Sequence, residues 1–457
     1  MIETLAEYAA GLRYKDLPPD VVHECKRKLI DTLGCAVGGF DSQPAAIARS
    51  LAARSRGNPS ARVLGTRERS TPELAAFANG VAMRYLDFND AYAARSTGHP
   101  SDVFAGVLAV ADAQRADGRT AILAATLAYD AFCNFSESVP REIGWDHTVY
   151  GVVACAVGAG KVLGLSRKAM GNAVSLAIIP NMALEQTRHG ELAMWKGCAA
   201  ADAARNGVFA AQLASAGMTG PAQAIEGRFG MWRALGKFEW QPFGGRGKPF
   251  RVTQTYIKAF PSVVHSQSPI TVALDLHGRI RKETRPGDIE SIAIETYWVA
   301  ERYVDRTNAL WHPETRETAD HSIPYCVAAA LIDGRITEKS FSGARIRDKR
   351  ITDLIERTAI RENADFNRVY PAEWPCRIEV KLKSGETQNA ETRYFKGHVK
   401  NPLTDAEIET KFRMLAAHAL TPAQADKVLA AAWRLEKLKD VGELLGLLKF
   451  RPVRRKK

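Results

Sequence analysis

Two aspartates and a histidine lie close together in one segment, LDFNDAYAARSTGHPSD, at residues 86–102. Asp87 and Asp90 are expected on a helix that ends within residues 91–96. Pro100 disfavours helical geometry for the residue before it, so His99 is expected in the loop that follows. A loop imidazole close to carboxylates suits general acid–base catalysis. The alternative is structural, with the aspartates capping a helix end and His99 only ordering the loop.

A second histidine, His147, lies in GWDHTVYG at residues 144–151. Asp146 or Thr148 is expected to cap the helix that follows. The positive end of that helix should lower the pKa of His147 and keep the ring neutral near pH 7. A neutral imidazole can act as a base or as a hydrogen-bond donor, and a simple capping position is the alternative.

Lys196 is a single cation between Trp195 and an alanine-rich stretch, with Arg188 and His189 just before it. A lysine is rarely buried without a partner. Lys196 therefore either extends its amine to solvent or meets an anion.

Lys258 and His265 flank a Phe-Pro pair in YIKAFPSVVHSQSP, and Ser266 and Gln267 follow directly. The segment lies near the expected junction of two domains, where ligand sites often form. A polar connection between domains is the alternative.

Several common sites have no sequence signature here. The chain has no P-loop, no G-x-G-x-x-G after a strand, no H-E-x-x-H and no G-x-S-x-G. None of its seven cysteines forms a C-x-x-C pair, so neither a zinc nor an iron–sulfur cage is indicated. We expect no metal and no organic cofactor.

The elements that must position these residues change along the chain. The first 265 or so residues favour helices, for example at residues 21–39 and 193–216. Alternating patterns around Ile292 and at residues 377–383 predict half-buried strands, with a helix near residues 325–333. Thr404 with Glu407, and Thr421 before a proline, predict two further helix starts.

Composition is that of a globular protein, with 46% hydrophobic and 25% charged residues. The net charge of +12 raises the question of nucleic acid. Lys and Arg are spread along the chain, however, and a basic balance also suits an anionic substrate. The first residues lack signal-peptide character, and no apolar run reaches the ~20 residues of a membrane span. We expect a cytoplasmic protein.

The four polar clusters together resemble the MmgE/PrpD family, which includes 2-methylcitrate dehydratase and cis-aconitate decarboxylase. LDFND…GHPSD is the most specific motif, and it looks like the dehydratase version. LIDTLGCAVGG, FANGVAMRYLDFND, DHTVYG, MWKG, FPSVVHSQ, ADHSIPY and GHVKNPLTD occur in family order over nearly the whole chain. His265 fits the dehydratase pattern, whereas the decarboxylase branch places its histidine where this chain has Val263.

The resemblance implies a mainly α protein with an α+β second domain. An all-helical domain would comprise residues 1–265 and 401–457, and an α+β lid residues 266–400. It also implies a homodimer with a metal-free site in the cleft. The implied site residues are Asp87, Asp90, His99, His147, Lys196, Lys258, His265 and Tyr325.

The implied activity is the removal of water from a small anionic, citrate-like polycarboxylate. His99 and His147 would exchange protons, Asp87 would orient one ring, and Tyr325 would donate from the lid. Asp90, His265 and the two lysines would bind substrate. The chain departs from the motif at Ala91, where dehydratases usually have threonine, which leaves the exact substrate open. A decarboxylase or isomerase of a related acid is an alternative. A basic nucleic-acid-binding or scaffold protein is a third hypothesis, but it requires clustered Lys and Arg with aromatic residues between them, which this chain lacks. We therefore expect neither nucleic acid nor a membrane as a partner.

Overall fold

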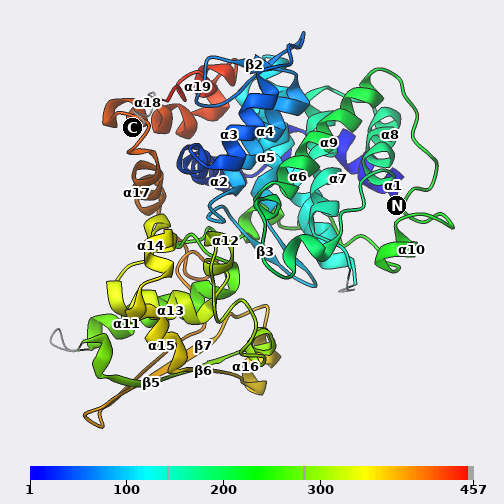
Figure 1. The fold of residues 1–457 in the computed structure, drawn as a ribbon. Coiled ribbons are helices and arrows are strands. Elements are labelled where there is room, and N and C mark those ends of the chain that lie inside the picture. Colours follow the sequence, from blue (N-terminus) through cyan, green and yellow to red (C-terminus); the bar gives the residue numbers. More distant parts are fainter. Residues whose placement is uncertain (141–143, 281–284, 451–457) are drawn as a thin grey trace. The chain divides into compact units, whose positions relative to one another are not determined.

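The computed structural model describes residues 1–140, 144–280 and 285–450 (Figure 1). It contains two compact units. The first comprises residues 1–188, 197–257 and 404–457, and the second comprises residues 189–196 and 258–403. The predicted fold class is confirmed, because the chain is mainly helical with a smaller α+β part.

The first unit contains helices from the N-terminal half of the chain and from its C-terminal part. The short pairs β1–β2 (Ala61–Arg62, Arg69–Ser70) and β3–β4 (Tyr92–Ala93, Thr97–Gly98) are its only named strands within the described residues. The helices are α1 (Ile2–Gly11), α2 (Pro19–Gly39), α3 (Gln43–Ala52), α4 (Pro72–Arg84), α5 (Val103–Ala113), α6 (Gly118–Ser138), α7 (Thr148–Val162), α8 (Arg167–Ile178), α9 (Ala199–Ser215), α10 (Trp232–Leu235), α17 (Asp405–Ala416), α18 (Pro422–Trp433) and α19 (Gly442–Leu445).

Helix α7 is the centre of the first unit, and α5, α6, α8 and α9 pack around it. Its sequence is rich in alanine, glycine and valine, so neighbouring helices approach closely. Gly207 of α9 shows how closely, since a Cβ atom there would lie 2.5 Å from the carbonyl oxygen of Val152. The small side chains therefore set the spacing of the helices that carry the polar loops.

The C-terminal helices pack against α2. The predicted capping box is confirmed, because Thr404 accepts from the Glu407 amide and Glu407 accepts from the Thr404 amide. In the buried interface, the Lys411 amine lies 2.6 Å from an Asp31 carboxylate oxygen and donates to the Phe88 carbonyl at 2.7 Å. An ion pair therefore joins α17, α2 and the loop after α4.

The second unit contains a four-stranded sheet in the order β6-β5-β7-β8. Strand β5 (Ile289–Thr296) is parallel to β6 (Thr358–Glu362) and antiparallel to β7 (Cys376–Leu382), which pairs with β8 (Thr387–Thr392). Alternate residues of β7 are buried, as the sequence predicted.

Helices α11 (Gln267–Arg279), α13 (Ile323–Asp333) and α15 (Lys349–Glu356) cover one face of this sheet (Figure 1). The short helices α12 (Arg316–Ala319), α14 (Gly343–Ile346) and α16 (Ala364–Val369) complete the unit. The predicted helix at residues 325–333 is confirmed, with its start two residues earlier.

The predicted helix at residues 193–216 is wrong at its start. Helix α9 begins at Ala199, and Met194–Gly197 forms a single 3-10 turn. The alanine-rich pattern begins only after this turn, and within the turn the Lys196 amine lies 3.8 Å from the buried carboxylate of Asp320 in the second unit. A tertiary ion pair here overrides the local helical preference.

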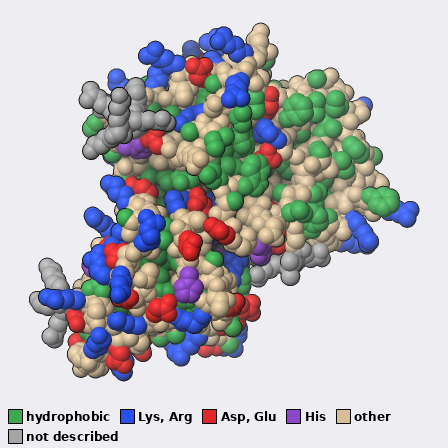
Figure 2. All heavy atoms as spheres, viewed as in Figure 1, with side chains coloured by type: hydrophobic (Ala, Val, Ile, Leu, Met, Phe, Trp, Pro, Cys, Tyr) green, Lys and Arg blue, Asp and Glu red, His purple; other side chains and the backbone are tan. Residues whose placement is uncertain are grey.

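No described helix is long and apolar enough to cross a lipid bilayer. On the face shown in Figure 2, Lys and Arg side chains lie among Asp and Glu side chains over the second unit, and hydrophobic side chains gather over the first. Such intermixing does not form the continuous basic stripe that typifies a nucleic-acid surface.

The Asp31–Lys411 pair provides a test of the first unit's stability. Replacing Lys411 by Met leaves a buried carboxylate without its cation, so the free energy of unfolding should fall by about 3–5 kcal/mol in chemical denaturation. Adding Asp31→Asn should recover part of that loss. Lys427→Met, on the exposed face of α18, is the control and should change stability by less than about 0.5 kcal/mol. Strictly additive losses in the double variant would contradict a coupled pair.

Candidate active site

Asp87 lies in a tight loop and not on the preceding helix, so that expectation was wrong. Helix α4 ends at Arg84, and Asp87 has a left-handed backbone with φ of +49°. Arg84 donates from Nη1 to the Asp87 carboxylate at 2.6 Å, and both side chains are buried. Pairing with Arg84 favours the turned conformation, which aspartate tolerates better than most residues.

His99 lies between two acceptors. Its Nδ1 is 2.7 Å from the carbonyl oxygen of Asp90, and its Nε2 is 3.9 Å from the Asp87 carboxylate. Because a carbonyl only accepts, Nδ1 must carry a hydrogen. The structure therefore brings His99 and Asp87 together, as the sequence suggested, with His99 outside any helix.

Asp90 is fully buried, and its carboxylate is used inside the unit. It accepts from the Tyr129 hydroxyl at 2.8 Å and from the Ser101 amide at 2.9 Å. The backbone carbonyl of the same residue holds His99. These bonds give Asp90 a positioning role in this loop.

Asp102, the last residue of the motif, is a feature that sequence reasoning missed. Asn89 donates to its carboxylate at 2.8 Å, and Arg84 Nε lies 3.8 Å away. Burial raises the pKa of Asp102 to about 7, with Asp90 adding to the rise and Arg84 opposing it. Burial therefore makes Asp102 a weaker acid than an exposed aspartate, beside the Arg84–Asp87 pair.

His147 stands at the N-cap of α7, where Asp146 accepts from the Thr148 amide at 2.9 Å. Arg188 donates to the same carboxylate at 2.6 Å. Burial would raise the pKa of Asp146, but its positive neighbours outweigh burial and hold that pKa below its usual range. Because His147 is neutral near pH 7, Arg188 is the neighbour that keeps Asp146 ionised.

Burial lowers the pKa of His147 to about 4, with Arg188 and Arg84 adding to the fall and Asp146 opposing it. The predicted neutral ring is confirmed, although burial is the main cause. The His147 ring lies 5.5 Å from that of His99, in an edge-on orientation. Its Nε2 has no hydrogen-bond partner among the residues that the structure describes.

A second polar cluster lies within the second unit. The Lys196 amine is 3.8 Å from the Asp320 carboxylate, and Arg316 is 3.3 Å from its other oxygen. His321 Nδ1 lies 2.5 Å from Asp320. Lys196 therefore meets an anion instead of extending to solvent, but sequence reasoning had not singled out Asp320, His321 or Arg316.

The remaining predicted residues of this unit are all buried. Lys258 is fully enclosed. His265 Nδ1 is 2.7 Å from the Tyr297 hydroxyl, within an aromatic cluster. The Tyr325 hydroxyl donates to the Ser340 carbonyl at 2.6 Å, and burial raises its pKa well above the usual range. These bonds hold His265 and Tyr325 inside their own unit.

Ala91 is also fully buried, and its backbone forms an antiparallel bridge with Tyr256.

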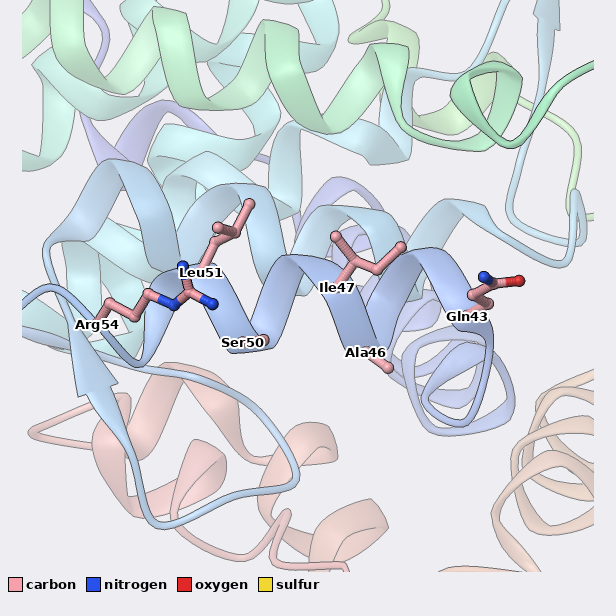
Figure 3. A pocket seen from close by; sticks show the side chains of 6 residues that line it. All are labelled: Gln43, Ala46, Ile47, Ser50, Leu51 and Arg54. Atoms are coloured by element: carbon pink, nitrogen blue, oxygen red, sulfur yellow. The ribbon is translucent and has the colours of Figure 1, made fainter.

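A shallow hollow elsewhere in the first unit runs along α3 and is lined by Gln43, Ala46, Ile47, Ser50, Leu51 and Arg54 (Figure 3). It contains none of the predicted site residues and only one ionisable side chain, so it is not the candidate reaction site.

The fold and these clusters place ionisable side chains of the kind that proton-transfer enzymes use. Residues 3–242 match the model of the MmgE/PrpD N-terminal domain, and residues 260–436 match that of the MmgE/PrpD C-terminal domain. The chain belongs to the MmgE/PrpD family, and it is an enzyme of the lyase class.

Three relatives illustrate the family. 2-Methylcitrate dehydratase of Cupriavidus necator is 32% identical over 94% of this chain and 91% of its own length. The Escherichia coli protein of that name is 31% identical over 77% of this chain and 75% of its own length. Cis-aconitate decarboxylase of Homo sapiens is 28% identical over 98% of this chain and 94% of its own length.

The His147 environment predicts a measurable pH response. NMR should show the ring titrating near pH 4. Unfolded histidine binds its proton near pH 6.5, so stability should fall as pH drops from about 6.5 to 4, where only the unfolded chain gains the proton. Arg188→Gln removes a positive charge that repels the protonated ring, so the His147 pKa should rise. Arg115→Gln, at an exposed arginine, should leave that pKa unchanged. An unaltered pKa in Arg188→Gln would contradict this electrostatic account.

Proposed function

We propose that this protein is a hydro-lyase that removes water from a small citrate-like polycarboxylate. The observation that carries the proposal is the placement of His99 between the Asp90 carbonyl and the Arg84–Asp87 pair, beside a neutral His147. His99 lies in the segment most similar to the dehydratase motif. The relatives named 2-methylcitrate dehydratase support the same reaction class.

Dehydration must break a C–H bond next to a carboxylate and a C–O bond on the neighbouring carbon. The electron pair of the C–H bond forms the new double bond, and the leaving hydroxide takes up a proton to become water. Negative charge develops on the carboxylate as the C–H bond breaks, so fixed cations and donors must stabilise it. One group must accept a proton and another must supply one.

His99 supplies the proton to the leaving hydroxyl in this proposal. Acceptors face both of its ring nitrogens, an arrangement that suits an imidazolium, and Asp87 holds the ring. His147 is too weakly basic near pH 7 to collect a proton from carbon, so it acts as a neutral hydrogen-bond donor. Lys196 and Lys258 bind substrate carboxylates. Asp90, His265 and Tyr325 position the parts of the site that they contact.

Two further features belong to the proposal. The protein is a cytoplasmic homodimer, and turnover needs no metal. Three carboxylates of these clusters already have a cation beside them, since Asp87 pairs with Arg84, Asp146 with Arg188, and Asp320 with Lys196 and Arg316.

Decarboxylation of a cis-aconitate-like acid is the second candidate. The human relative named cis-aconitate decarboxylase supports it, because it matches 98% of this chain. The position of His265 within FPSVVHSQ favours dehydration. Release of carbon dioxide instead of water from the substrate would show that the reaction is decarboxylation and not dehydration.

The substrate class is tested by incubating the purified protein with citrate, 2-methylcitrate and related acids. We expect absorbance from a new conjugated double bond and an unsaturated product one water lighter by mass spectrometry. Dialysis against a chelator should leave the rate unchanged. Loss of turnover that iron or zinc restores would refute the metal-free mechanism, and turnover of none of the acids would refute the substrate class.

His99 provides the residue-level test. His99→Asn keeps the size and hydrogen bonding but cannot carry a proton, so kcat should fall by about 10²–10⁴ with little change in KM. Asp87→Asn should give a smaller loss through poorer orientation of the ring. His418→Asn, at a half-exposed histidine of the same unit, is the control. A His99→Asn enzyme that melts early yet turns over normally would assign His99 a purely structural role.

A further inference from the structure

Asn89 and Asp102 have no role in the scheme above, although both lie in the segment that carries His99. Both side chains are buried, and they belong to the first unit, as do Arg84, Asp87 and His99. A buried carboxylate and a buried amide need hydrogen-bonding partners. The partners that they have here connect them to the Arg84–Asp87 pair.

The Asp102 carboxylate serves the loop and not the helix that it adjoins. Asp102 ends the 3-10 turn Pro100–Asp102 and leads directly into α5. An acidic side chain at such a helix start commonly accepts hydrogen bonds from the first amides of the helix. Within the part of the chain that the structure describes, the Asp102 side chain makes no capping bond to α5. It accepts from the Asn89 side chain at 2.8 Å, and one of its oxygens lies 3.8 Å from Arg84 Nε.

Asn89 links these two charged groups through its side-chain amide. Its nitrogen donates to Asp102 at 2.8 Å and to the Ser101 hydroxyl at 3.0 Å, and its oxygen accepts from Arg84 Nη1 at 3.4 Å. An amide nitrogen has two hydrogens, so it can make both donations at once. The reverse orientation of the amide would place its oxygen against the Asp102 carboxylate, where two acceptors would meet. The partners of Asn89 therefore determine the orientation of its side chain.

Arg84 lies between the carboxylates of Asp87 and Asp102. Its Nη1 donates to Asp87 at 2.6 Å, and its Nε lies 3.8 Å from Asp102. A guanidinium is planar and its donors point in fixed directions, so an anchor at Nε also determines where Nη1 points. The Nη1 bond in turn holds the carboxylate that lies 3.9 Å from His99 Nε2. A chain of contacts thus runs from Asp102 through Arg84 and Asp87 to the His99 ring.

We propose that Asn89 and Asp102 are positioning residues of the reaction, which act through Arg84 to hold Asp87 in place beside the His99 ring. This inference rests on the proposed function, in which His99 gives a proton to the leaving hydroxide. The two residues determine how His99 is held, and they bind no part of the substrate. Their loss should therefore slow proton transfer and lower kcat, while KM changes little.

The kinetics of two variants of nearly unchanged size test this role first. Asp102→Asn removes the negative charge beside Arg84, and Asn89→Asp places an acceptor against the Asp102 carboxylate. Each should lower kcat by about 10–100-fold with little change in KM, the range typical of residues that orient a reacting side chain. A kcat within about twofold of the wild-type value, or a loss confined to KM, would overturn the proposal.

Asp112→Asn is the matched control. Asp112 is a buried aspartate of α5 that pairs with Arg62 and Arg69, about 15 Å along the helix from Asp102. Its replacement should lower the melting temperature but leave kcat per folded molecule unchanged. An equal fall of kcat in Asp112→Asn and Asp102→Asn would assign the loss to general destabilisation and overturn the proposal.

An NMR measurement without substrate separates this inference from the proposed function. Asp102→Asn should shift the nitrogen-15 signals of the His99 ring. The shift should be much smaller when Asp87→Asn is already present, because Asp87 relays the change. Equal shifts in both backgrounds, or no shift in either, would overturn the inference. If the wild-type protein turns over none of the acids, the proposed function fails, and these signals still decide whether Asp102 positions the ring.

Discussion

A buried carboxylate needs a cation beside it, and this requirement shapes both units. The free-energy cost of moving an ionised group out of water can exceed the whole stability of a domain, unless a nearby opposite charge compensates for it. The chain meets the requirement repeatedly, with the pairs Asp31–Lys411, Asp87–Arg84, Asp146–Arg188 and Asp320–Lys196. Each pair fixes a loop or helix end, and two of them lie beside the histidines on which the proposed chemistry depends.

The sequence predicted helices and strands correctly where residues close together in the chain determine them. The capping box at Thr404 and the alternating pattern at residues 377–383 correspond to α17 and β7. The prediction failed where a distant contact decides the backbone. Asp87 leaves the helix because it pairs with Arg84, and Lys196 leaves the expected helix because it reaches Asp320.

The candidate site shows the same division. Motifs identified His99 and His147, and the helix-terminus argument gave the correct direction for the pKa of His147. They did not reveal that burial is the main cause, nor that burial raises the pKa of Asp102. Such properties depend on which side chains surround a group in space. Tyr325 is a further example, because its place in a motif predicted a donor but not that its hydroxyl donates to the Ser340 carbonyl.

The reach of Lys411 back to Phe88 bears on how the chain is made. The two residues are 323 positions apart, and the whole second unit lies between Phe88 and α17 in the sequence. On the ribosome, the N-terminal helices and the loop that carries Asp87 emerge long before their lysine is synthesised. Asp31 then lacks its ion-pair partner Lys411, and folding of the first unit cannot finish until α17 has been synthesised. Nascent chains stalled before α17 thus represent a stage at which the loop that carries Asp87 still lacks its bond from Lys411 to the Phe88 carbonyl.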